Sequence, residues 1–214
     1  MLLYYITDRR AFAGSEDKQR QAVLGCMAEA AAAGVDYIQL REKDLCAREL
    51  EQLAKEAVAA VRAHSLSTRL LMNGRVDVAL ACGAGGVHLP GGFLSASEVR
   101  AIWMRASDLT PVIGVSAHSV EEAVSAAEQE ADFAVLAPIF EKPGTQLPGL
   151  GPRALEAAHD RLSSFPVLAL GGVTLANAAQ CLYAGAAGVA GIRLFQEGDL
   201  HATVRCLREL NGFT

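Results

Sequence analysis

The sequence lacks an excess of positive charge, and this excludes one large class of function. Among its 214 residues, 19 lysines and arginines stand against 24 aspartates and glutamates, which gives a formal net charge of -5. Proteins that bind the phosphate backbone of nucleic acids need a basic face. We therefore expect no nucleic-acid partner.

Long hydrophobic runs are also missing. The apolar stretches are short and interrupted by glycine, so the sequence predicts no membrane-spanning helix. The opening MLLYYITDRR places apolar residues before basic ones and has no long apolar core, unlike a secretory signal. Five cysteines are scattered and none forms a CxxC pair, a pattern typical of buried thiols in a reducing compartment. We expect a cytoplasmic protein with no membrane contact.

What the sequence has in quantity is apolar residues, 51% of the chain, in a regular alternation of strand and helix. Eight runs are apolar on both faces, as buried parallel strands are. They cover 2–7, 35–42, 68–73, 85–90, 111–117, 132–140, 165–172 and 188–195. Helical windows follow them at about 17–33, 47–64, 75–83, 95–105, 119–130, 152–162, 174–184 and 198–211. This alternation predicts one α/β domain over residues 1–214, a (β/α)8 TIM barrel.

Polar residues gather where these apolar runs end. In this fold the active site lies at the carboxyl ends of the strands, and polar side chains are costly to place there without a use. The candidates for substrate binding are Gln39, Arg41, Asn73, Ser116 and His118.

The stretch QLREKD after the second run places Gln39, Arg41 and Lys43 on one face of the chain. Two cations and an amide that point the same way suit an anionic ligand. The alternative is an ordinary salt-bridged strand end.

The last two runs favour a phosphate site, because the loops after strands 7 and 8 often bind phosphate in this fold. Gly171 and Gly172 leave backbone N–H groups open, and Arg193 lies near the carboxyl end of the last run. The alternative is a tight turn beside a surface arginine.

Two histidines stand at strand ends, His88 and His118. Either has a pKa suited to general acid–base catalysis near neutral pH. We favour His88, whose alternative role is a hydrogen bond to a backbone carbonyl.

Taken together, the motifs YITD, IQLREK, MNGRVDVAL, GVHLP, IGVSAHSVEEA, PIF, ALGGV and AGAAGVAGIRLF cover nearly the whole chain. They resemble the thiamine phosphate synthase/TenI family of (β/α)8 proteins. The resemblance implies a phosphate site at Gly172, Gly191, Ile192 and Arg193, and a small-molecule partner, thiazole phosphate or thiamine phosphate. We also expect a homodimer, which is common among small barrels.

The resemblance includes departures from the synthases of the family. Those enzymes join a hydroxymethylpyrimidine diphosphate to a thiazole phosphate with Mg²⁺ held by two aspartates. Here the first of these positions is Gly74, and the turn LPGGFL has no acid at the second. In the loop after strand 6, Lys142 is the cation left to meet an anion. Because Mg²⁺ prefers carboxylate oxygens, we expect no cofactor, with Mg²⁺ only if the chain is a synthase.

The stretches MNGRVD and LPGGFLS resemble the TenI branch, whose thiazole tautomerases aromatise a carboxythiazole phosphate by proton transfer without a metal. Arg41 and Lys43 would then bind the carboxylate. The histidine of that branch falls where this chain has Pro138, so His88 is the candidate base and Lys43 the second. We predict a tautomerase. The alternatives are a synthase and a non-catalytic binder of thiazole phosphate or thiamine phosphate.

Overall fold

In the computed structural model, which describes residues 1–141, 148–162 and 164–210, eight parallel strands close into a barrel in sequence order. The closure is made by β8 against β1, with Tyr5 opposite Gly191. The strands are β1 (Leu2–Ile6), β2 (Tyr37–Leu40), β3 (Arg69–Asn73), β4 (Gly86–Leu89), β5 (Val112–Ala117), β6 (Phe133–Leu136), β7 (Val167–Ala169) and β8 (Gly188–Gly191). The predicted (β/α)8 barrel is confirmed.

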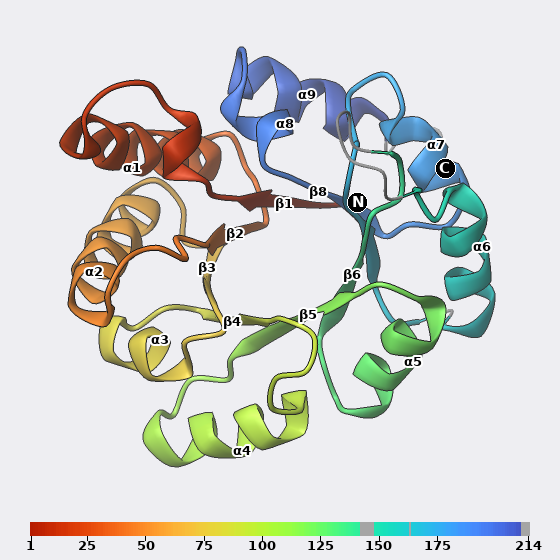
Figure 1. The fold of residues 1–214 in the computed structure, drawn as a ribbon, viewed down its shortest axis with the longest axis horizontal. Helices are drawn as coiled ribbons and strands as arrows, with labels where there is room; N and C mark the ends of the chain where they lie inside the picture. Colours follow the sequence, from red (N-terminus) through yellow and green to blue (C-terminus); the bar gives the residue numbers. More distant parts are fainter. Residues whose placement is uncertain (142–147, 163, 211–214) are drawn as a thin grey trace.

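Helices surround the barrel as an outer ring (Figure 1). They are η1 (Arg9–Ala11), α1 (Glu16–Ala32), α2 (Ala47–His64), α3 (Val76–Cys82), α4 (Ala96–Ala106), α5 (Val120–Glu128), α6 (Pro152–Arg161), α7 (Ala178–Tyr183), α8 (Arg193–Gln196) and α9 (Leu200–Leu210). Within the described ranges, no helix is long and apolar enough to cross a bilayer.

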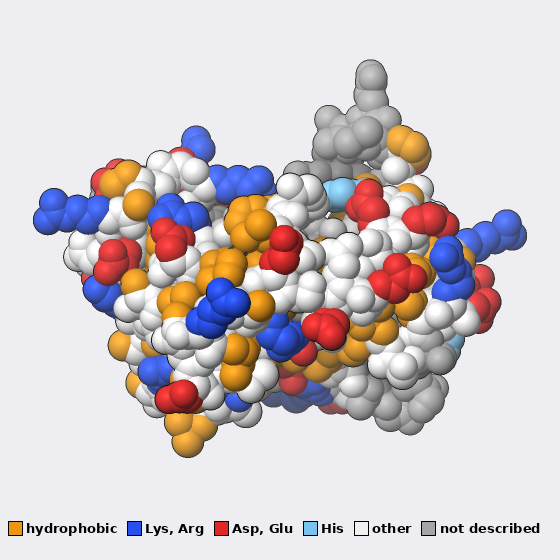
Figure 2. Space-filling model, turned by 90° about the horizontal axis from the view of Figure 1, so that it is seen from below, with side chains coloured by type: hydrophobic (Ala, Val, Ile, Leu, Met, Phe, Trp, Pro, Cys, Tyr) orange, Lys and Arg blue, Asp and Glu red, His pale blue; other side chains and the backbone are white. Residues whose placement is uncertain are grey.

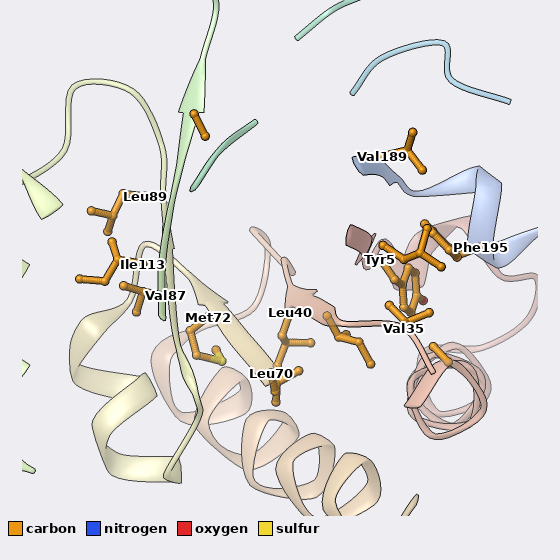
Figure 3. Packing of buried hydrophobic residues seen from close by; sticks show 14 of the residues in the cluster. Tyr5, Val35, Leu40, Leu70, Met72, Val87, Leu89, Ile113, Val189 and Phe195 are labelled. Atoms are coloured by element: carbon orange, nitrogen blue, oxygen red, sulfur yellow. The ribbon is translucent and has the colours of Figure 1, made fainter. Parts of the chain in front are cut away.

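The core has two layers, because successive strand residues point to opposite faces of the sheet. Leu40, Leu70, Met72 and Tyr5 point outward and pack beneath the helices, where the ring of Tyr5 lies 5.9 Å from that of Phe195 on α8 (Figure 3). A second cluster lies inside the barrel and includes Tyr4, Leu71, Phe133, Val135 and Leu168. This inner cluster fills the barrel interior beneath the residues at the carboxyl ends of the strands.

Four strand predictions were too long by four or five residues. The runs 35–42 and 165–172 are strand only over Tyr37–Leu40 and Val167–Ala169. The run 188–195 is strand only to Gly191, and Arg193–Gln196 forms the short helix α8 instead. The run 132–140 is strand only over Phe133–Leu136. Proline has no N–H to donate to a ladder, and Pro138 follows shortly after this strand. In these last two runs the apolar stretch continues past the ladder because it packs against the helical layer, where Ile139 and Phe195 are buried.

The side of the molecule in Figure 2 carries acidic and basic side chains intermixed, with apolar atoms between them. Charges on this side are therefore not sorted by sign.

Candidate functional site at the barrel mouth

Four polar side chains form two hydrogen-bonded pairs at the carboxyl ends of neighbouring strands. Gln39 of β2 donates from Nε2 to Oδ1 of Asn73 on β3, at 3.1 Å. His88 of β4 and Ser116 of β5 are joined between Nε2 and Oγ, at 2.9 Å. Because Asn73 is the register partner of His88, the two pairs are adjacent. The structure therefore brings these four predicted residues together.

His88 lies in the barrel interior, beside the rings of Tyr4 and Phe133 at centroid distances of 5.6 and 6.2 Å. Burial, helped by the positive charge of Arg41, lowers the pKa of His88 to about 3. The imidazole is therefore neutral at pH 7. Its Nδ1 has no hydrogen-bond partner in the described part of the chain. As a base of such low pKa it is weak, so the predicted catalytic role requires a ligand that changes its surroundings.

This lowered pKa predicts an acid-sensitive fold. In the unfolded chain the histidine pKa is 6.5. Below this pH the unfolded chain binds a proton at His88, whereas the buried imidazole of the folded chain stays neutral. The free energy of unfolding should therefore fall as pH drops below 6.5, by about 1.4 kcal/mol per pH unit from this group, until pH approaches 3. His88→Gln, which can keep a bond to Ser116 but does not titrate, should flatten the slope. Urea unfolding of both proteins between pH 6.5 and 4.5 measures this, and equal slopes would contradict the burial of a neutral imidazole.

Arg41 and Lys43 follow β2, which ends at Leu40, and Lys43 lies in the turn after it. Arg41 is half-buried and Lys43 is exposed. Neither side chain makes an ion pair or hydrogen bond with another residue of the described ranges. The salt-bridged strand end that we considered is made instead by Glu42. The two cations are thus available to an anion at the mouth.

The turn after β7 is built on two glycines with positive φ, 93° at Gly171 and 64° at Gly172. A Cβ at Gly171 would lie 2.7 Å from Pro138, and one at Gly172 would lie 2.8 Å from Cβ of Phe140. Phe140 also donates its N–H to the carbonyl of Gly171, at 3.0 Å. Only glycine fits this close approach of β7 to the end of β6.

Asn177 fixes the same turn by donating from Nδ2 to the carbonyl of Gly172 at 2.9 Å. The N–H groups of Gly171 and Gly172 donate to no other described residue. Next to this turn, Gly191 ends β8, Ile192 caps α8, and exposed Arg193 opens it. The predicted phosphate residues thus lie at the ends of two paired strands.

His118 stands at the rim rather than inside. Its Nδ1 lies 2.9 Å from the carbonyl of Ala137, and because a carbonyl only accepts, Nδ1 carries the hydrogen of this bond. A pocket of about 730 Å³ lies beside the rim, between the β4–α4 turn and α5, with Ser116 and His118 in its wall. Lys142 lies outside the described residues.

Sequence reasoning missed an ion-pair cluster around buried Arg9, which binds two acids of the segment that follows β2. Arg9 is only 4% exposed, and it binds Glu42, Asp44 and Glu16. Thr7 at the end of β1 belongs to the same cluster, where its hydroxyl donates to Glu42. Arginine in the first turn after a strand has no special sequence signal, so this cluster required the structure.

The donors at the mouth do not fit a magnesium site. They are amide, hydroxyl, imidazole and guanidinium groups, whereas Mg²⁺ is bound in proteins mainly through carboxylates. A Cβ at Gly74 would lie 3.5 Å from the ring of Pro90. Two acids near the strand ends are engaged: Glu42 with Thr7 and Arg9, and Glu122 with the N–H of His118. No cluster of three or more His, Cys, Asp or Glu in the described ranges is arranged for a metal.

Comparison with known proteins decides the family. The sequence profile of the thiamine monophosphate synthase family matches residues 3–195. The chain belongs to this family. A putative thiamine-phosphate synthase 2 of Aquifex aeolicus is 37% identical over 196 residues, 91% of this chain and 97% of the relative. The thiamine-phosphate synthase of Methanoculleus marisnigri is 41% identical, over 84% of this chain and 83% of the relative.

Solved structures give the same assignment to the thiamine monophosphate synthase family. The thiamine phosphate pyrophosphorylase of Pyrococcus furiosus superimposes with a TM-score of 0.81 at 28% identity, and the match covers 99% of this chain and 96% of that one. A 3-hexulose-6-phosphate synthase matches at 0.67 and 22% identity, which shows the shared barrel alone. The chain therefore belongs to a family of thiamine biosynthesis. The enzymes of this family act on small phosphorylated molecules.

Proposed function

We propose that the barrel mouth binds a thiazole phosphate, with the phosphate at the Gly171–Gly172 turn and the start of α8. The carrying observation is that turn, whose N–H groups are unpaired within the described residues and whose neighbour Arg193 is exposed. Backbone N–H groups and an arginine together suit a phosphate. Arg41 and Lys43 then face a second anionic group across the mouth.

The first reaction to test on this ligand is its coupling to a hydroxymethylpyrimidine diphosphate, which yields thiamine phosphate. The names of the relatives support it, since they are thiamine-phosphate synthases at 37% and 41% identity. The Gln39–Asn73 pair would bind the polar edge of a ring, and Arg41 with Lys43 would bind the diphosphate. Because the mouth has no carboxylates to hold Mg²⁺, Arg41 and Lys43 would themselves balance the negative charge of the diphosphate.

The second candidate is the metal-free tautomerisation of a carboxythiazole phosphate. The carboxylate-free donor set favours it, because a proton transfer needs an acid–base group and anion sites but no metal. Arg41 and Lys43 would hold the substrate carboxylate. His88, with Ser116, is the proposed proton carrier, and Lys43 is the second.

A paired assay on the purified protein separates these reactions. One arm supplies thiazole phosphate and the pyrimidine diphosphate, with Mg²⁺ or with EDTA, and measures thiamine phosphate. The other arm supplies carboxythiazole phosphate in EDTA and follows tautomerisation for the wild type and His88→Ala. Product in the first arm supports the synthase, and a rate in the second that is lost in His88→Ala supports the tautomerase.

Calorimetric titration with thiazole phosphate completes the test. Binding without either reaction would leave a non-catalytic binder. Arg193→Gln should weaken binding, by about 10-fold for the loss of one charge-assisted contact. The matched control, Arg205→Gln on the outside of α9, should not. Absence of binding by the wild type would overturn the proposal.

A further inference from the structure

The two cations at the barrel mouth have acidic neighbours in the sequence. If these carboxylates were unpaired, they would form ion pairs with the cations and reduce the positive charge at the mouth. Arg41 and Lys43 alternate along the chain with Glu42 and Asp44. Opposite charges a few ångströms apart attract strongly where water is partly excluded. Yet neither cation pairs with either neighbouring acid in the described structure.

Arg9 accounts for this by binding both acids. Its Nη1 lies 2.6 Å from Oδ1 of Asp44 and 3.2 Å from Oε2 of Glu42, and its Nη2 lies 2.9 Å from Oδ2 of Asp44. The pairing with Asp44 is therefore bidentate, the geometry in which arginine holds a carboxylate best. Nη2 also reaches Glu16, at 2.9 Å.

The backbone of the cationic segment is fixed by the same cluster. The N–H of Arg41 donates to Oγ1 of Thr7 at 3.0 Å. Thr7 in turn donates to Oε1 of Glu42 at 2.7 Å, and the N–H of Arg9 reaches the same oxygen at 3.1 Å. The end of β1 therefore sets which way each side chain after β2 points.

The charge balance shows how much depends on one residue. Arg9 is the only cation that contacts the three acids Glu16, Glu42 and Asp44 among the described residues. Burial raises the pKa of Glu42 while its bonds from Thr7 and Arg9 oppose the shift, and Arg9 lowers the pKa of Asp44. Without Arg9, Asp44 is free to turn toward the mouth.

We propose that Arg9 is a positioning residue that keeps Arg41 and Lys43 available to an anionic ligand by holding Glu42 and Asp44 away from them. This inference rests on the proposed function only in placing an anion at the mouth. It adds a residue that touches no ligand and acts through the charges of its neighbours.

The test measures binding of inorganic pyrophosphate by calorimetry, so the outcome does not depend on which thiazole reaction occurs. Arg9→Gln should weaken pyrophosphate binding about 10-fold, through the newly unpaired acids beside Arg41. Adding Asp44→Asn removes the freed charge and should bring binding back to within about 3-fold of the wild type. Glu16→Gln is the control. It removes the Arg9–Glu16 ion pair, which lies outside the segment of Arg41 and Lys43, and it should bind normally.

The rescue separates charge control from a merely structural clamp. Asp44→Asn removes a further bond from the cluster, so a structural role predicts additional loss and not recovery. If Arg9→Gln does not fold, Arg9→Lys keeps the charge but cannot hold both acids in the same geometry, and its loss should likewise be reversed by Asp44→Asn. Unchanged binding in the Arg9 variants, or no rescue, would overturn the proposal. If the wild type binds pyrophosphate but not thiazole phosphate, the proposed function fails while this inference stands.

Discussion

Replacement of Gly188 by alanine is expected to cost at least about 3 kcal/mol of unfolding free energy, because it overpacks the seam that closes the barrel. Gly188 opens β8 opposite Leu2 of β1. A Cβ there would lie 2.0 Å from the carbonyl oxygen of Leu2 and 2.7 Å from its amide nitrogen. Backbone atoms in a paired strand cannot move aside as a flexible side chain can, so the two strands would have to separate.

Urea unfolding measures this loss, and the chain offers its own control. Gly25 lies on the exposed side of α1, where nothing is within 4 Å of a new Cβ. Gly25→Ala should therefore stabilise the protein by up to about 1 kcal/mol through helix propensity. A Gly188→Ala protein within about 1 kcal/mol of the wild type would contradict the close approach of β8 to β1.

Replacement of Arg41 by glutamine is expected to weaken binding of carboxythiazole phosphate by about 30-fold to 150-fold. The reason is that a hydrogen bond to a charged group contributes roughly 2–3 kcal/mol. Arg41 is half-buried, so solvent screens its charge less than that of exposed Lys43. Its guanidinium forms no ion pair or hydrogen bond with another described residue.

Calorimetry at two salt concentrations checks this result. Added salt should weaken the wild type more than Arg41→Gln, since the variant has lost the charge that salt screens. Arg205→Gln on α9 controls for the change in net charge. Equal dissociation constants for the wild type and Arg41→Gln would show that the anion binds elsewhere.

The fold was predictable because its signals are local and repeated. Apolar runs on both faces and helices between them recur eight times, and the hydrophobic pattern that makes each unit is legible without its neighbours. The ends of the runs were less certain. Residues 193–195 continue the strand-like pattern of the last run, yet they form part of α8. The pairing of β8 with β1 stops at Gly191.

The mouth was predictable as a set of strand ends but not as a set of contacts. Alternation along QLREKD gave the shared face of Gln39 and Arg41. It could not show that Gln39 bonds Asn73 or that His88 is buried deeply enough to hold its pKa near 3. Those facts depend on the barrel interior, where Gly114 leaves room for the rings of His88 and Phe133. The role of Arg9 was out of reach for the same reason.

The contact between the β7 glycines and the end of β6 has a consequence for anyone who rebuilds this barrel. Pro138 and Phe140 occupy the space that side chains at Gly171 and Gly172 would need, and Ile139 and Phe140 donate hydrogen bonds to Leu170 and Gly171. The two segments are therefore one interlocking part. A designer who transplants the Gly171–Gly172 turn into another barrel must transfer the end of β6 with it, as a single unit.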